Sequence, residues 1–541
     1  MRGKTVCTLG VCLGMFGLAR LALGANTRLL NRIPTSSRMV FYLASMQRFD
    51  HLLATIARHL DNQDGGNDQM AVPPLQTALA SMGLPDAINL DGSVAIVVPG
   101  NTIGVALDNV PSIFILPISK RKNFCRDTSA KSIGHGFYQG EIRNFDLGMP
   151  HTEKFVFLFA GHHALCGKTV KSIAAFEHAQ HHLSPSQVAG VANVGTPLLS
   201  VRLNMPQEAF ELRAGITAMI GMQGQLLGPK PKPSLRTMDW QRLEGSLINQ
   251  TESLTITLSQ QGRVLISHVH ITAKPNSAMA QLFAAQHTLS ARTLNVFPLH
   301  HYLLASACAI NWRAVDEFAS PFFQPKSKPA AGADKGRKSA MEKWIFPWLI
   351  NHMSSCVLVA AGKPNNPTAS MLAHFDSRIA AKTMRSHITA LEAFLPEGSL
   401  IGLKIGKVDA DGVALELGNG GAADQYRVGK IDDRSLLLAR KDDFPKLANS
   451  VVRKTISPTR TYRRLMRSMK RYLSPHMILA VFYSARAATA NAPKAATGAL
   501  AFPVHHRPLL FMLSRDDRGI DVDYVIPPGF INSIQAGAFL P

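Results

Sequence analysis

The sequence lacks the short motifs that most directly reveal an activity. None of its six cysteines stands in a CxxC pair, so a zinc or redox motif of that kind is not indicated. There is no HExxH and no GxSxG, which would mark a zinc hydrolase or a serine hydrolase. A triad built from distant residues stays open, because triads are defined by geometry and not by order. The sequence therefore identifies no catalytic residue and no cofactor.

Long apolar runs are absent after the N-terminal segment. In the rest of the chain, no window approaches the roughly 20 apolar residues of a membrane span. At the N-terminus, Arg2 and Lys4 precede an apolar stretch at residues 6–19, and small residues follow at 22–25. This layout predicts a secretory signal peptide over residues 1–25 and export to the periplasm or cell envelope. Arg20, at the end of the apolar stretch, keeps an uncleaved membrane tether as the alternative.

Acidic residues are scarce relative to basic ones, with 36 Asp and Glu against 58 Lys and Arg, which gives a net charge of +22. The predicted signal peptide accounts for only three of the positive charges, so the mature chain stays strongly basic. For an exported protein this charge favours an anionic membrane surface or an envelope polymer as partner. Solubility alone is the other explanation for the charge.

Four cysteines remain after residue 25, namely Cys125, Cys166, Cys308 and Cys356. Export permits disulfides, and four cysteines allow three pairings. One disulfide and isolated buried thiols are both compatible with the sequence.

A local pattern of apolar strand, polar turn and helix recurs along the chain. Its instances begin at Met39, Ser112, Phe155 and Leu198 in the first half, and at Cys356, Ser435 and Ile478 in the second. Phe155 precedes Ser435 by 280 positions, as Leu198 precedes Ile478. Each half ends in alternating apolar residues around a polar turn, from Leu254 and from Leu509, which predicts antiparallel strands with one covered face.

These repeats predict an α+β fold with two tandem, duplicated domains at 30–318 and 342–541. The segment 319–341 is rich in Pro, Ala and Lys, which is typical of a linker. This layout, with a signal peptide and hairpins followed by PNSAMAQLF and PPGFINSIQ, resembles large exported bacterial proteins assigned only to domains of unknown function. The resemblance implies export and brings no catalytic residues.

The stretch FVFLFAGHHALCGKTVKSI at 155–173 looks like a phosphate-binding loop at first sight. That loop needs four residues between its first glycine and GK[ST], whereas five separate Gly161 from Gly167. We therefore expect no nucleotide, and we interpret GKT as a turn and the start of a helix.

Histidines form a second group of candidates near this stretch. His162, His163, His178 and His182 are weak candidate metal ligands, because a helix over 168–182 would place His178 and His182 on one face. The polar end of a surface helix explains the same residues without a metal.

A basic helix is predicted at 457–473, where Ser457 and Pro458 form a helix start. Its cations are candidate anion-binding residues: Arg460, Arg463, Arg464, Arg467, Lys470 and Arg471. A core-packing helix with one solvated face is the alternative, and nucleic acid is a less favoured partner because no recognised nucleic-acid motif accompanies it.

From these features we expect an exported, non-enzymatic binding or scaffolding protein of the cell envelope that contacts an anionic surface or polymer. The alternative is an exported hydrolase that uses a metal held by the histidine cluster. The sequence does not indicate an oligomeric state.

Overall fold

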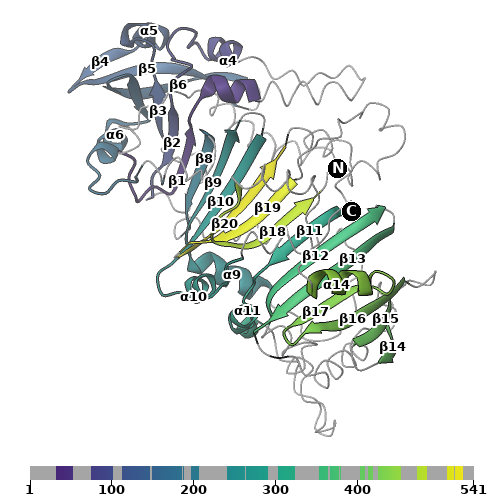
Figure 1. The fold of residues 1–541 in the computed structure, drawn as a ribbon. Helices are drawn as coiled ribbons and strands as arrows, with labels where there is room; N and C mark the ends of the chain where they lie inside the picture. The colour runs from purple at the N-terminus through teal and green to yellow at the C-terminus, as the bar shows by residue number, and fades with distance from the viewer. Residues whose placement is uncertain are drawn as a thin grey trace. The chain divides into compact units, whose positions relative to one another are not determined.

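The structure, a computed structural model, forms two compact units (Figure 1). Unit 1 comprises Met1–Leu212 and Glu252–Ile271, and unit 2 comprises Arg213–Thr251 and Thr272–Pro541. The described residues are 32–52, 75–100, 112–146, 149–184, 187, 196–205, 240–261, 264–289, 302–322, 353–363, 366–376, 378, 403–408, 412–417, 424–452, 472–483, 509–516 and 518–527.

Unit 1 is built on an antiparallel sheet. Its strands are β1 (Met39–Leu43), β2 (Val94–Val98), β3 (Ile113–Pro117), β4 (Lys131–Gly134), β5 (Phe137–Asp146), β6 (Met149–Ala160), β7 (His163–Gly167), β8 (Thr196–Asn204), β9 (Thr251–Gln261) and β10 (Val264–Ala273). Along the sheet their order is β4-β5-β6-β7-β3-β2-β1-β8-β9-β10.

Unit 2 also contains an antiparallel sheet. Its strands are β11 (Tyr302–Cys308), β12 (Met353–Lys363), β13 (Asn366–Phe375), β14 (Leu403–Val408), β15 (Gly412–Leu417), β16 (Asp424–Asp432), β17 (Ser435–Arg440), β18 (Met477–Tyr483), β19 (Leu509–Arg515) and β20 (Gly519–Ile526). Their order is β14-β15-β16-β17-β13-β12-β11-β18-β19-β20. Numbered from its own first strand, each unit therefore has the order 4-5-6-7-3-2-1-8-9-10.

Helices are short and fewer than strands among the described residues. Unit 1 holds α4 (Leu75–Ser81), α5 (Arg121–Asp127) and α6 (Val170–Glu177), and unit 2 holds α9 (Trp240–Gln250), α10 (Ala278–Ala284), α11 (Trp312–Ala319), the 3-10 helix η3 (Ser320–Phe322) and α14 (Phe444–Val452). This content is consistent with the predicted α+β class.

The predicted linker at 319–341 lies outside the described residues except for 319–322. Strand β11 and helix α11 precede that segment in the chain and belong to unit 2.

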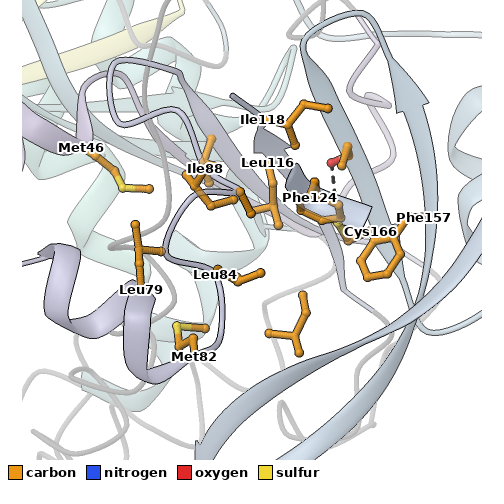
Figure 2. Close-up of a cluster of buried hydrophobic side chains, with 14 of the residues drawn as sticks. Met46, Leu79, Met82, Leu84, Ile88, Leu116, Ile118, Phe124, Phe157 and Cys166 are labelled. Atoms are coloured by element: carbon orange, nitrogen blue, oxygen red, sulfur yellow. Dashed lines mark hydrogen bonds between the residues drawn. The ribbon is translucent and has the colours of Figure 1, made fainter. Parts of the chain in front are cut away.

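The core of unit 1 lies on both faces of its sheet. Neighbouring residues of β7 point to opposite faces, so Cys166 joins one cluster with Phe124 and Phe157, and Leu165 joins another with Ile113. Figure 2 shows the first cluster, in which side chains from α4, α5 and the strands converge. Because both faces are covered, several strands are continuous apolar runs such as VAIVV in β2.

Strand β9 reverses the usual relation between polarity and burial. Thr257 is fully buried and Thr255 is 4% exposed, whereas Ile256 between them is 40% exposed. The alternation from Leu254 thus predicted strands correctly, but the covered face is the one that carries hydroxyls. These hydroxyls find polar neighbours inside the unit, since Thr257 Oγ1 donates to Ser200 Oγ at 3.5 Å.

Candidate functional site

The stretch that resembles a phosphate loop is a hairpin followed by a helix. Strand β6 ends at Ala160, Gly161 turns the chain with φ of +61°, and β7 begins at His163. The segment between the apolar run and GKT, which the pattern of strand, turn and helix left as part of the turn, is therefore mostly a strand. The interpretation as a turn was wrong because only His162 of the two histidines is exposed to solvent.

Each residue of the GKT triplet has a partner or a packing role within unit 1. A Cβ atom on Gly167 would lie 2.9 Å from Ser172 Oγ, so glycine lets α6 pack closely on β7. The backbone N–H of Ser172 donates to Thr169 Oγ1 at 3.1 Å, which makes Thr169 the N-cap of α6. Lys168 Nζ lies 3.0 Å from Glu153 Oε1. The predicted helix start at GKT is confirmed.

His163 is buried, with 3% of its surface exposed, and its two ring nitrogens have no hydrogen-bond partner. Burial, with a smaller contribution from His162, lowers the pKa of His163 to about 4. The imidazole is therefore neutral at pH 7. Its position between Pro117 of β3 and Ala160 of β6 in the ladder makes it a residue of the sheet interior.

The other candidate histidines do not share a helix face. Helix α6 ends at Glu177, His178 is its C-cap, and His182 instead forms an isolated bridge with Pro34. The premise of a helix over 168–182 was wrong, because the chain leaves the helix to pair with the segment before β1. Within the described residues, none of His162, His163, His178 and His182 belongs to a group of three side chains close enough to share a metal ion.

The predicted basic helix lies outside the described residues. This applies to Arg460, Arg463, Arg464, Arg467, Lys470 and Arg471, so their role stays a prediction.

A different group of cations is well placed at the start of α5. Lys120, Arg121 and Lys122 are consecutive and exposed, and we call them the α5 basic cluster. The Arg121 guanidinium lies 4.7 Å from the ring centroids of both Tyr138 and Phe159 and donates to the Tyr138 hydroxyl. Cation–π contact and this hydrogen bond fix Arg121 on the aromatic surface of β5 and β6.

Two nearby acids, Asp86 and Asp127, are already paired with one other cation, Arg126. Arg126 Nη2 lies 2.8 Å from Asp86 Oδ2 and 2.9 Å from Asp127 Oδ1. In the described part of the chain, no ion pair involves any member of the α5 basic cluster. The positive charge of the cluster is therefore not neutralised by an acidic side chain within the described structure.

The sequence contains this cluster as ISKRKNFCR, in which three basic residues are adjacent. The anion-binding prediction was placed on the segment after Ser457 because that segment carries more basic residues. The same stretch also contains an SxxK spacing, at Ser119 and Lys122. In the structure the Ser119 hydroxyl donates to the carbonyl oxygens of Asp86 and Ala87, and no hydrogen bond joins it to Lys122 among the described contacts. The Ser119 hydroxyl is therefore engaged with the backbone and is not positioned by Lys122 in the described structure.

Comparisons with known proteins leave the class of the chain open. No family model matches it, and no curated protein matches it. A solved structure titled "Structure of crystal form I of TP0453" is similar over 49% of this chain and 88% of that chain, at 10% identity and a TM-score of 0.23. A TM-score this low carries no conclusion about fold or function. Among the described residues, no helix has the length and hydropathy to cross a membrane.

Proposed function

We propose that the chain is an exported, non-enzymatic binding protein of the cell envelope whose α5 basic cluster contacts phosphate or carboxylate groups. The observation that carries the proposal is the cluster itself: three consecutive exposed cations that form no ion pair in the described structure. The net charge of +22 would attract the same partners over a longer range.

The three cations have different tasks in this proposal. Arg121, held by Tyr138 and Phe159, would present a fixed set of donors, whereas Lys120 and Lys122 would supply mobile charge. A lysine near an anionic surface contributes about 1 kcal/mol, so removal of both lysines should cost about 2 kcal/mol, or roughly 30-fold in affinity at low salt.

The test compares two double variants with the same change in charge. K120Q/K122Q removes the lysines of the cluster, and K154Q/K171Q removes two exposed lysines of β6 and α6. Each protein is titrated with vesicles that contain anionic phospholipid, with purely zwitterionic vesicles and with soluble polyphosphate, over a series of salt concentrations. We expect K120Q/K122Q to weaken binding to an anionic probe much more than K154Q/K171Q does.

The vesicle and polyphosphate arms distinguish a lipid headgroup from a polymer as the source of the anion. Equal losses in both double variants would contradict the α5 basic cluster as the site and leave only general charge. Loss confined to R463Q/R464Q/R467Q would move the site to the predicted basic helix. Stoichiometric zinc in the purified protein would favour the metal-dependent hydrolase.

We also propose that the two units arose by duplication. Their identical order of ten strands supports this, and so does the register of pairing. The offset of 280 between Leu198 and Ile478 maps Leu199 onto Leu479, and the offset of 255 between Leu254 and Leu509 maps Leu258 onto Leu513. Leu199 pairs with Leu258, and Leu479 pairs with Leu513. The two offsets, which come from the sequence alone, thus map one paired position of unit 1 onto a paired position of unit 2.

Strand order corrects one match within the repeat. Ser435 begins β17, the seventh strand of unit 2, and its counterpart by order is His163 of β7. The match of Ser435 to Phe155 of β6 is displaced by one strand, because β7 was not predicted as a strand of its own.

A further inference from the structure

Two cysteines of unit 2 face each other across neighbouring strands. Cys308 is the last residue of β11, and its partner in the antiparallel register is Cys356 of β12. Directly opposed residues of such a ladder have Cα atoms about 4.5–5.5 Å apart, within the range of about 4.4–6.8 Å that disulfides require. The two side chains already form a hydrogen bond with each other. The Cα separation of an opposed pair is therefore compatible with a bond between their sulfur atoms.

The pair is chemically unequal. The hydrogen bond from Cys356 lowers the pKa of Cys308 to about 7, and backbone hydrogen bonds at Ile310 and Cys356 act in the same direction. Cys356 keeps the shared proton, so the pKa of its thiol is raised. At neutral pH Cys308 is therefore a substantial thiolate, which is the reactive form of cysteine. Both residues are only half-buried, so a reagent in solution can reach them.

The described cysteines of unit 1 have neither a cysteine partner across the ladder nor a lowered pKa. Cys166 is 1% exposed, and burial raises its pKa well above the usual value (Figure 2). Its ladder partners are Phe114 and Phe157. Burial also raises the pKa of Cys125, although Arg121 opposes that effect.

The sheet itself does not require sulfur at this place. Cys308 pairs with Leu479 of β18 as well as with Cys356. In unit 1, Leu199 pairs with Leu43, which in turn pairs with Val94. Under the register that matches Leu199 to Leu479, an apolar pair thus occupies the place of the two cysteines. The thiols are a property of unit 2 that packing alone does not explain.

We propose that Cys308 and Cys356 form a disulfide by exchange with an external disulfide compound. The Cys308 thiolate attacks the external disulfide, which forms a mixed disulfide and releases one thiolate. Cys356 then loses its proton and attacks the Cys308 sulfur, which forms the Cys308–Cys356 bond and releases the second thiol. Two protein thiols are oxidised, and the external disulfide is reduced to two thiols.

The test uses the full chain with oxidised glutathione as the probe. The reaction is quenched with acid, free thiols are alkylated, and digested peptides are analysed by mass spectrometry. We expect one crosslinked peptide that joins Cys308 to Cys356 and is two hydrogens lighter than the two reduced peptides together. Cys125 and Cys166 should be alkylated to the same extent with and without oxidised glutathione.

Single variants test the order of attack. In C356A, we expect glutathione to remain on Cys308 as a mixed disulfide, because no second thiol completes the exchange. The same variant should slow alkylation of Cys308 at pH 7 roughly tenfold, since the pKa returns toward about 8.5. In C308A, Cys356 should stay largely unmodified.

Three results would overturn the proposal. They are alkylation of both thiols at every glutathione concentration, a stable mixed disulfide on Cys308 in the unaltered chain, and a crosslink from Cys308 to any other cysteine. The double variant C308L/C356V, which copies the apolar pair of unit 1, controls for folding, and its circular dichroism spectrum should match that of the reduced protein.

Discussion

Acid should destabilise unit 1 through one buried histidine. Unfolded, His163 would titrate near its ordinary pKa of about 6.5, whereas in the folded unit its pKa is about 4. Between these values the unfolded chain binds a proton that the folded chain does not. Titration of His163 therefore leaves the free energy of unfolding unchanged above about pH 6.5 and lowers it as the pH falls from 6.5 to 4.

The size of the effect follows from the two pKa values. Over the whole interval the loss is about 3 kcal/mol, and between pH 7.5 and pH 5.0 it is about 2 kcal/mol. His163 also has two buried ring nitrogens without a hydrogen-bond partner. H163L removes the buried nitrogens without partners and also the group that titrates. The variant should therefore be more stable than the unaltered chain by about 1 kcal/mol at pH 7.5 and by about 3 kcal/mol at pH 5.0.

The neighbouring residue provides a matched control. His162 precedes His163 directly but is exposed in the turn between β6 and β7, so H162L should keep most of the pH dependence and lose only the small contribution of His162 to the lowered pKa of His163. Hydrogen exchange of peptides from β6 and β7, measured at both pH values and corrected for intrinsic rates, reports local stability without a two-state assumption for the whole chain. If protection in H163L falls with acid as steeply as in the unaltered chain, burial of a neutral His163 is the wrong explanation.

Two further predictions concern the contact between β7 and α6. G167A should destabilise this region by about 1–3 kcal/mol, since the added Cβ would lie 3.0 Å from both Ile113 Cδ1 and Ile173 Cγ1 as well as 2.9 Å from Ser172 Oγ. S172A in the same chain relieves one of the three contacts, so a full rescue by S172A would contradict a tightly packed helix. T169A should lower stability by about 1 kcal/mol through loss of the N-cap, while T169S should not. Denaturant titration followed by far-UV circular dichroism measures the stability of the Gly167 and Thr169 variants. Equal stability of T169A and T169S would contradict the N-cap.

Sequence patterns predicted local elements where apolar spacing and turn residues act within a few positions. The strand at Met39, the hairpins from Leu254 and Leu509, and the helix start at Thr169 are examples. Strand β7 was not predicted, because its apolar run is only three residues long and the adjacent pair His162 and His163 suggested an exposed segment, whereas His163 is buried. Strand β4, whose four residues are all exposed, carries no apolar signal.

The order of the strands was less accessible to sequence reasoning. β11 lies between β12 and β18, although β18 follows it by more than 160 positions, and no local pattern indicates such a pairing. The cysteine pair depends on the same step, because Cys308 and Cys356 meet only once β11 and β12 are in register. Spacing in the sequence had left all three pairings of four cysteines open.

The comparison of equivalent positions separates what the fold needs from what a unit adds to it. Leu43 and Val94 are 0% and 1% exposed and belong to the core of unit 1, whereas Cys308 and Cys356 are half-buried. A position that only holds the sheet together can be apolar in both units, since packing depends on volume and burial. A pair of opposed thiols instead adds a bond that responds to the redox state of the surroundings. The same reasoning applies to the α5 basic cluster, where Lys120 and Lys122 are exposed and make no ion pair in the described structure. Charge and sulfur placed where the sheet does not need them are therefore the features in which the function of this chain should be sought.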